Sequence, residues 1–271
     1  MGQALPGAAV RSLVLVDPRR HGGVWQEFVA GQRRCYERFG VAAASVEVDA
    51  TVADVWCVVA LRGEALVAGA RLHVKTPGRP LPLEGLLGRH AALEEELHDR
   101  RAEGVAEVGG LWATEDLAGT GIGGPVIAAA VACAAAIPVR HLVSFAHHHN
   151  RFTRAVGFEP DARLGVHAYP DKRYRSTVNW CDAFEPATAE PFVQRAIQQW
   201  RRHALAGDPL PFDLYAWNRD GRSAADPQSL EEDARHGHVS RPDPSHEAPG
   251  ADGPAAHDQH RPAAGGVHQP T

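Results

Sequence analysis

The stretch LAGTGIGGP, residues 117–125, places four glycines within six positions. An apolar run that predicts a strand, 104–113, precedes it, and an alanine-rich run that predicts a helix, 122–136, follows it. The first N–H groups of a helix have no partner within the helix and lie at the positive end of its dipole, so they favour anions, phosphate in particular. Glycines also remove the Cβ atoms that would hold a phosphate away. The stretch therefore predicts a phosphate-binding loop, with a tight turn that allows close helix packing as the alternative.

The residues that would form this loop are Gly119, Thr120, Gly121, Ile122, Gly123 and Gly124. Pro125 suits the start of a helix, because its missing N–H would have no partner there in any case. The glycine spacing is GxGxG and not the GxGxxG of dinucleotide-binding folds, and no Lys-Ser or Lys-Thr pair follows, which excludes a Walker loop.

The rest of the chain predicts a largely antiparallel arrangement of strands and helices. Strands are predicted at 11–16, in a hairpin over 54–74, at 104–113, at 140–147 and in two runs around 163–180, and helices at 24–39, 122–136, 150–156 and around 190–205. Gly63 is expected in the hairpin turn. Residues 76–103 read as a loop followed by a charged helix inserted between the hairpin and the next strand.

Composition places the chain among soluble globular proteins. It has 271 residues, 44% of them hydrophobic, and a formal charge of −5, which gives no reason to expect a nucleic-acid partner. No segment resembles a leader or a membrane span, so a cytoplasmic protein is expected. The four cysteines are scattered without a CxxC pair, and neither a disulfide framework nor a metal site is predicted.

Three regions are predicted along the chain. Residues 1–183 form the main domain, 184–218 form a packing helix with an extension, and 219–271 form a disordered tail rich in Pro, Gly and His. The histidines of the tail lack a regular spacing, so a metal site there is not favoured.

Two segments carry a resemblance to a known superfamily. LWATEDLAGTGIGGPVI, residues 111–127, and NRFTRAVGF, residues 150–158, resemble the central motif and the following short helix of the GNAT acyltransferases. The resemblance implies an α+β fold of three layers, with a mixed, mostly antiparallel central sheet flanked by helices. It also implies that the glycine loop holds the phosphates of coenzyme A or of a carrier protein's pantetheine, and that the strand before it pairs with pantetheine through Leu111, Trp112 and Ala113, with Asn150 nearby.

This chain departs from the GNAT pattern at two places. Ala118 stands where an Arg or Gln opens the motif, and Thr153 and Arg154 stand where a general-acid Tyr is often found. GARLHVKTPGRPLPLEG, residues 69–85, resembles a segment of autoinducer synthases and of N-acyl amino acid synthases, which transfer acyl chains from acyl carrier protein to an amine. In that resemblance Arg71 is the strand arginine, Glu84 the acid of LPLE, and Glu107 the carboxylate before the phosphate loop.

Acyl transfer from a thioester to an amine needs a base and an oxyanion donor. Glu107 lies among apolar neighbours that would raise its pKa, which makes it the candidate base, although a structural pairing with Arg71 is an equal expectation. A backbone N–H near Leu111 or Trp112 would stabilise the oxyanion. His147, at the end of the next strand, is the candidate proton relay, with a role in shaping the acceptor pocket as the alternative.

Two further residues are candidates for the substrate pocket. Arg33, next to Arg34 and Arg38 on the predicted helix 24–39, suits a substrate carboxylate or an acidic carrier protein, with a solvated basic face as the equal alternative. Tyr169 is expected to line the acyl or acceptor pocket, or simply to belong to the core.

Three functions follow as hypotheses. The first is an N-acyltransferase that moves an acyl group from acyl-CoA or acyl carrier protein to a small-molecule amine, without a metal. The second is a non-catalytic GNAT-fold module that binds acyl-CoA or a partner, which the missing Arg and Tyr favour. The third is a structural protein whose tail recruits partners and which binds no thioester.

Overall fold

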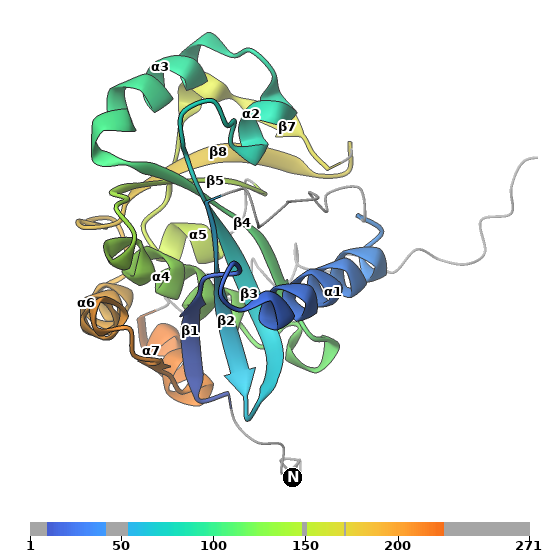
Figure 1. The fold of residues 1–271 in the computed structure, drawn as a ribbon, viewed down its shortest axis with the longest axis vertical. Helices are drawn as coiled ribbons and strands as arrows, with labels where there is room; N and C mark the ends of the chain where they lie inside the picture. Colours follow the sequence, from blue (N-terminus) through green and yellow to red (C-terminus); the bar gives the residue numbers. More distant parts are fainter. Residues whose placement is uncertain (1–9, 42–53, 148–150, 171, 225–271) are drawn as a thin grey trace, which may run out of the picture. The chain divides into compact units, whose positions relative to one another are not determined.

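A single mixed sheet organises the part of the chain that the computed structural model describes, residues 10–41, 54–147, 151–170 and 172–224 (Figure 1). The strands are β1 (Ser12–Val16), β2 (Val55–Arg62), β3 (Ala65–Val74), β4 (Val105–Ala113), β5 (His141–His147), β6 (Glu159–Pro160), β7 (Val166–Ala168), β8 (Arg175–Asp182) and β9 (Leu210–Pro211). The helices are α1 (Gly22–Arg38), α2 (Pro82–Leu87), α3 (Ala91–Arg100), α4 (Gly123–Cys133), α5 (Arg151–Ala155), α6 (Pro191–Ala206) and α7 (Leu214–Ala224), besides short 3-10 turns.

The strand order is β6-β8-β5-β4-β3-β2-β1-β9, with β7 paired to β8. Every strand pair of the described residues is antiparallel except β4 with β5. A parallel pair needs a crossover connection, and α4 supplies it. The predicted mixed, mostly antiparallel sheet flanked by helices is confirmed.

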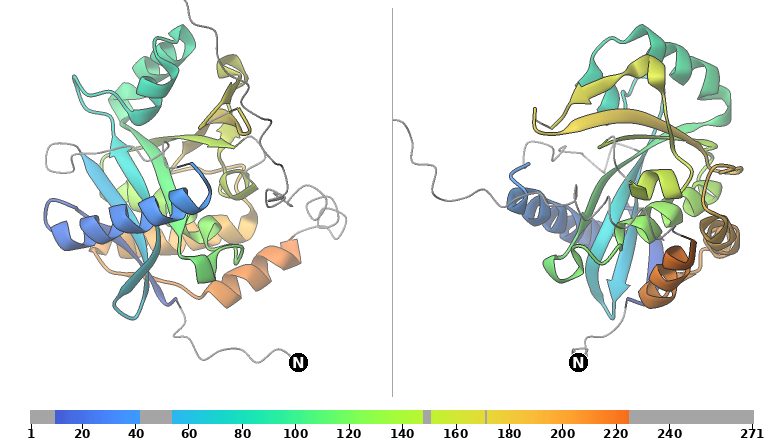
Figure 2. Two further views of the ribbon diagram at one scale, coloured as in Figure 1. Left: turned by 90° about the vertical axis from the view of Figure 1, so that its right-hand side faces the viewer. Right: turned by 180° about the vertical axis from the view of Figure 1, so that it is seen from behind.

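Helices cover both faces of the sheet (Figure 2). On one face α4 packs against β1 to β4 and against α6, and its residues from Gly124 to Cys133 are all buried. This burial explains why the alanine-rich sequence has no polar side. On the other face α1 packs against β3 and β4 through Phe28, which contacts Trp112 edge to face.

Helix α1 approaches the sheet closely at Gly31. A Cβ placed there would collide with the Trp112 ring, so only glycine allows this distance between helix and sheet.

Strands β4 and β5 diverge after a short parallel ladder. They pair only from Val105 with His141 to Val108 with Ser144. Beyond that point β4 continues beside β3 as far as Ala113, and β5 continues beside β8 as far as His147. The edge of β4 over residues 109–113 therefore has no neighbouring strand on the β5 side within the described residues.

A bulge interrupts β4 where the divergence begins. The register with β3 shifts between the pair Arg71–Gly109 and the pair Gly69–Trp112, and Gly110 has a φ of +64°. One extra residue reverses the alternation of side chains. As a result Glu107 and Trp112, five positions apart, both face the side of the sheet that α1 and α2 cover.

Two regions differ in detail from the sequence predictions. The insertion 76–103 contains two helices, α2 and α3, and not one. Helix α7 runs to Ala224, so the predicted boundary between extension and tail at 218/219 falls inside a helix, and β9 adds the extension to the sheet beside β1. None of the described helices combines the length and apolar character that a membrane-spanning helix needs.

Candidate active site at the divergence of two strands

Ionisable side chains gather on the α1 and α2 side of the sheet, at the start of the divergence. Arg71 and His73 lie two positions apart on β3 and so share a face, and Glu107 is the register partner of His73 on β4. All three are buried, with exposed fractions of 3%, 7% and 6%. Tyr36 of α1 and Tyr169 after β7 interact electrostatically with Arg71. The structure thus brings together three of the predicted residues, Arg71, Glu107 and Tyr169.

Glu107 is the carboxyl group at the centre of this cluster. Its Oε2 accepts a hydrogen bond of 2.8 Å from the main-chain N–H of Leu83. Burial raises the pKa of Glu107 to about 7, although the Leu83 N–H and the charge of Arg71 oppose the rise. The other oxygen, Oε1, lies 3.6 Å from where a Cβ on Gly109 would be. Gly109 is the first β4 residue past the parallel ladder, so this oxygen lies beside the open edge.

Helix α2 delivers the Leu83 N–H to Glu107 because Glu84 fixes the start of that helix. Glu84 Oε2 accepts from the main-chain N–H of Leu81 at 2.6 Å, and Lys75 Nζ donates to the same carboxylate at 2.6 to 2.9 Å. The side chains of Leu81 and Leu83 are buried in an apolar cluster under α2 and α3. Glu84 therefore acts on the site indirectly, by holding the helix that contacts Glu107.

His73 is a member of the site that the sequence analysis did not single out. Burial, together with the positive charge of Arg71, lowers the pKa of His73 to about 3, so the imidazole is neutral at pH 7. The spacing of two residues from Arg71 on one strand was the signal that could have identified it.

Gln32 and Tyr36 were also missed. They lie four residues apart on α1, so both face the sheet. A Cβ on Gly110 would lie 2.7 Å from Gln32 Nε2 and 2.6 Å from Arg71 Nε, which places two donor groups over the bulge. Burial raises the pKa of the Tyr36 phenol, and partial burial raises that of the Tyr169 phenol.

The glycine loop lies at the start of α4, as predicted. Gly119 and Gly121 have φ values of +76° and +83°, which favour glycine. The N–H groups of Thr120 and Gly124 donate to Leu117 O and Gly121 O, within the turn itself. No backbone hydrogen bond leaves the N–H groups of Gly121, Ile122 or Gly123 in the part of the chain that the structure describes. These three donors at the positive end of an eleven-residue helix form an anion-binding arrangement.

Leu111, Trp112 and Ala113 lie on the open edge of β4, between the bulge and the glycine loop. The Leu111 side chain reaches toward α4, where its Cδ2 lies 3.3 Å from the position of a Cβ on Gly123. The Trp112 side chain is buried under α1, 3% exposed, so only its main chain is available to a ligand. The strand thus leads from the buried carboxyl of Glu107 to the anion-binding loop.

His147, Arg33 and Asn150 do not join the cluster. His147 lies four residues beyond Val143, the β5 partner of Glu107, which is about 13 Å along the strand, and its ring faces Tyr174. Arg33 is exposed on α1, while Gln32 and Cys35 beside it are buried. Asn150 lies outside the described residues.

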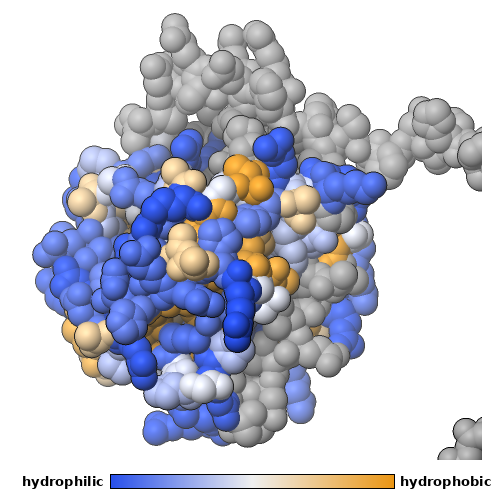
Figure 3. All heavy atoms as spheres, turned by 90° about the horizontal axis from the view of Figure 1, so that it is seen from above, coloured by the Kyte–Doolittle hydropathy of each residue, from blue (hydrophilic) through white to orange (hydrophobic). Residues whose placement is uncertain are grey.

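Aromatic side chains line the β5 side of the divergence. The Phe145 ring lies 5.3 Å from that of Tyr169 and 5.8 Å from that of His167. Phe145 also packs against the apolar cluster beneath α2 and α3. Figure 3 views the molecule from the side of α2, α3 and β7 and shows a few hydrophobic residues among hydrophilic ones. Leu86 of α2 and Val166 of β7 are exposed.

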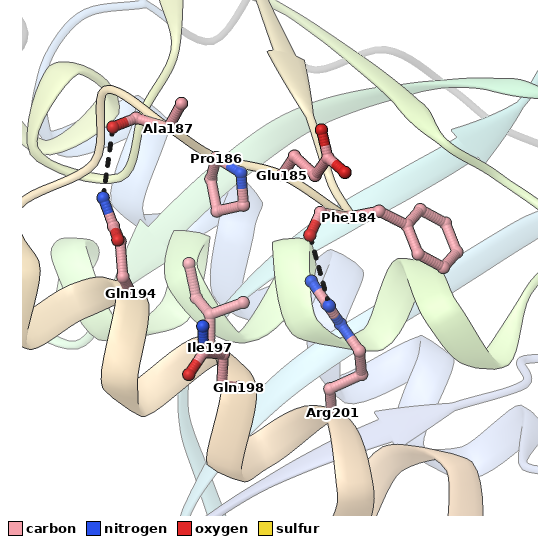
Figure 4. Close-up of a pocket in the computed structure, with 8 residues that line it drawn as sticks. All are labelled: Phe184, Glu185, Pro186, Ala187, Gln194, Ile197, Gln198 and Arg201. Atoms are coloured by element: carbon pink, nitrogen blue, oxygen red, sulfur yellow. Dashed lines mark hydrogen bonds between the residues drawn. The ribbon is translucent and has the colours of Figure 1, made fainter.

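A separate shallow pocket lies between residues 184–187 and α6 (Figure 4). Its polar side chains already bind the loop above them: Arg201 donates to Phe184 O and Ala183 O, and Gln194 donates to Ala187 O. This pocket is therefore a packing feature and not a candidate site. In the described ranges, no three side chains of His, Cys, Asp or Glu lie together in a way that would hold a metal ion. The four cysteines are buried free thiols.

No protein-family model and no curated protein matches the chain. Among solved structures it is similar to FeeM, an N-acyl amino acid synthase from uncultured soil microbes, with 14% identity and a TM-score of 0.50 over 68% of this chain and 97% of that one. It is also similar to BjaI, a CoA-dependent acyl-homoserine lactone synthase, with 13% identity and a TM-score of 0.45 over 69% of this chain and 88% of that one. Escherichia coli ElaA has 17% identity and a TM-score of 0.43 over 63% of this chain and 98% of that one. The described part of the chain therefore has the GNAT fold and shares it with the N-acyl amino acid synthase FeeM.

Proposed function

We propose that the protein is an N-acyltransferase, which moves an acyl group from a thioester to the amine of a small molecule. One observation carries the proposal: the open edge of β4 runs from the buried carboxyl of Glu107 to the anion-binding loop at the start of α4. Acyl transfer from a thioester needs a proton acceptor, which a carboxyl with a pKa near 7 can be, and a site for the phosphate of the donor, which the loop can provide. FeeM, which has the same fold, is named as an N-acyl amino acid synthase.

The donor would bind along the divergence. The N–H groups of Gly121, Ile122 and Gly123 would hold a phosphate of coenzyme A, or that of a pantetheine arm. The main-chain groups of residues 109–113 would pair with the pantetheine amides as a missing neighbouring strand would. The thioester would then lie near Gly109 and Gly110, where β4 bulges and Glu107 Oε1 approaches.

The chemistry requires one proton acceptor and one oxyanion donor. Glu107 would take a proton from the acceptor ammonium, which frees the nitrogen lone pair to attack the thioester carbonyl carbon. A main-chain N–H at the bulge, near Leu111, would stabilise the oxyanion that forms. The attacking nitrogen then loses its second proton, the C–S bond breaks to leave the amide, and the departing thiolate takes up that proton to become the free thiol. His147 lies too far along β5 to share the first proton transfer with Glu107, so its role as relay would concern the leaving thiolate.

The acceptor would lie on the α1 and α2 side, near Arg71 and Tyr169, which interact electrostatically with Glu107, and near Tyr36, which interacts with both of them. A positive charge and two phenol groups suit an acceptor that carries a polar or anionic group beside its amine. The aromatic wall of Phe145 and Tyr169, backed by the apolar cluster under α2 and α3, would suit a long acyl chain.

An acyl carrier protein is the alternative source of the thioester. Arg33, Arg34 and Arg38 form an exposed basic row on α1, which suits an acidic carrier. The guanidinium of Arg38 also lies over the ring of Phe39, a residue that is 52% exposed. A charge reversal at Arg33 would weaken transfer from carrier protein without affecting transfer from acyl-CoA.

The experiment measures binding and turnover of the full chain with acetyl-CoA, a long-chain acyl-CoA and acyl carrier protein charged with the same chain. A ligand at one hundred times its dissociation constant should raise the free energy of unfolding by about 2.7 kcal/mol, visible as a thermal shift. Amide formation with a panel of amines, followed by mass spectrometry, tests transfer. Thioester binding without transfer to any amine would indicate the non-catalytic module instead, and no binding of any thioester would overturn both.

A further inference from the structure

The C-terminal helix α7 packs directly on the glycine loop, more than ninety positions earlier in the chain. Asn218 Nδ2 donates to Thr120 O at 2.8 Å. The other amide atom, Oδ1, lies 2.9 Å from where a Cβ on Gly121 would be. Trp217 Nε1 lies 3.5 Å from the corresponding position on Gly124. Two adjacent residues of α7 therefore contact both halves of the loop.

Helix α7 is held firmly in this position. Asp213 begins it, since its carboxylate accepts from the N–H groups of Tyr215 and Ala216 at 2.8 and 3.1 Å. Trp217 stacks on Trp200 of α6, with ring centroids 5.6 Å apart, and meets Phe192 edge to face at 5.1 Å. Figure 2 shows α7 beside α6 and α4 on the same face of the sheet.

The hydrogen bond from Asn218 controls the direction of one anion-binding N–H. Thr120 C=O and Gly121 N–H belong to one peptide unit, which is planar and trans, so they point in opposite directions. Gly121 has a φ of +83°, and a glycine allows this peptide unit to rotate at little cost. Asn218 fixes the carbonyl and thereby fixes the N–H on the opposite side of the unit.

We infer that Asn218 is a positioning residue for the thioester: it holds the Thr120–Gly121 peptide so that the Gly121 N–H faces the phosphate. This inference rests on the proposed function. Helix α7, which the sequence pattern placed partly in a tail, thereby belongs to the donor-binding site.

The test compares Asn218→Ala, Asn218→Asp and Tyr215→Ala in the full chain. Tyr215 lies on the same helix and is 79% exposed, so its variant controls for general effects on α7. Asn218→Ala should raise the calorimetric dissociation constant of CoA about tenfold, the effect of one lost hydrogen bond. Asn218→Asp should raise it further, because a carboxylate beside the phosphate repels it, and added salt should reduce that difference. Tyr215→Ala should bind CoA as the wild type does.

A second readout does not depend on the ligand. The amides of Thr120, Gly124 and Val126 are hydrogen-bonded within the turn, so their hydrogen exchange reports its order. In the absence of CoA, Asn218→Ala should speed hydrogen exchange across residues 117–126. In a separate assay at saturating thioester, the kcat of this variant should stay within about twofold of the wild-type kcat. Unchanged exchange and unchanged CoA affinity in Asn218→Ala would overturn the inference and leave the proposed function intact. A wild type that binds no thioester, with faster exchange in the variant, would overturn the proposed function and leave the positioning of the loop standing.

Discussion

The main-chain N–H of Leu83 donates to Glu107 Oε2 at 2.8 Å and so joins the inserted helix α2 to the central strand β4. The bond occupies one carboxyl oxygen and leaves the other toward Gly109, where the open edge of β4 begins. The insertion 76–103 is therefore part of the site, because it orients the carboxyl group that we propose as the base.

Replacing Glu107 by Gln should abolish most of the activity and preserve donor binding. The amide can still accept from the Leu83 N–H, but it cannot take a proton. We expect kcat/KM to fall by about 10² to 10⁴, the usual contribution of a general base, and the dissociation constant of the thioester to change by less than about twofold. Glu94→Gln, an exposed glutamate on α3, is the matched control. Comparable activity in Glu107→Gln and wild type would limit Glu107 to a structural pairing with Arg71.

Glu107 and His73 should make opposite contributions to the pH dependence of the free energy of unfolding. Burial raises the pKa of Glu107 from 4.5 to about 7, so between these values the folded state binds more protons than the unfolded state and the free energy of unfolding falls as pH rises. Burial lowers the pKa of His73 from 6.5 to about 3, so between these values the folded state binds fewer protons and the free energy of unfolding rises with pH. From pH 4.5 to 6.5 the two contributions have opposite signs and should largely cancel.

Single substitutions should expose each contribution separately. In Glu107→Gln the free energy of unfolding should rise with pH between 4.5 and 6.5, and in His73→Gln it should fall, each by at most about 1.4 kcal/mol per pH unit. Urea unfolding of the wild type and both variants at pH 4.5, 5.5 and 6.5 measures this. Parallel profiles for all three proteins would show that neither group has the shifted pKa.

Local patterns in the sequence were sufficient for the central part of the fold. The two β-rich runs on either side of Gly63, the apolar run before the glycine loop and the alanine-rich run after it correctly predicted the hairpin, β4 and α4. Arg71 and Glu107 were singled out by the resemblance to autoinducer synthases, and Tyr169 by its place in a strand-like run near the end of the domain. These predictions depended only on periodicity and motifs, and both can be read from residues that are close together in the sequence.

Long-range pairing explains what the sequence did not reveal. The two residues of β9 form a strand only because β1, about two hundred positions earlier, offers an edge. Helix α7 has a short apolar pattern whose partners, Trp200 and Phe192, lie on α6. The separation of His147 from Glu107 depends on the register of β4 with β5, and the face of Trp112 depends on the bulge at Gly110. Register and bulges are set by contacts between strands and not by the pattern within one strand.

The bulge itself should be sensitive to a single methyl group at Gly110. A Cβ there would combine the cost of a positive φ with contact of 2.6 Å to Arg71 Nε. Gly63, in the β2–β3 turn, has a φ of +61°, close to the +64° of Gly110, and a Cβ there would have no atom within 4 Å. Gly63→Ala therefore measures the cost of the positive φ alone, about 1 kcal/mol. Gly110→Ala should lower the free energy of unfolding by roughly 1 to 3 kcal/mol more than that, because the buried side chains must shift. Equal losses in the two variants, measured by urea unfolding, would mean that Arg71 and Gln32 do not enclose the bulge.

Introducing a basic side chain at residue 118 should strengthen donor binding. Ala118 is exposed and immediately precedes the glycine loop, so an arginine there can reach a phosphate held by the Gly121–Gly123 N–H groups. We expect Ala118→Arg to lower the dissociation constant of CoA about tenfold at low salt, with a smaller gain at 0.5 M salt as the charges are screened. Ala65→Arg adds the same charge at an exposed position of the β2–β3 hairpin and should leave the affinity unchanged. If both variants gain equally, the effect comes from net charge and not from a phosphate at the loop; if neither gains, the phosphate does not bind at the start of α4.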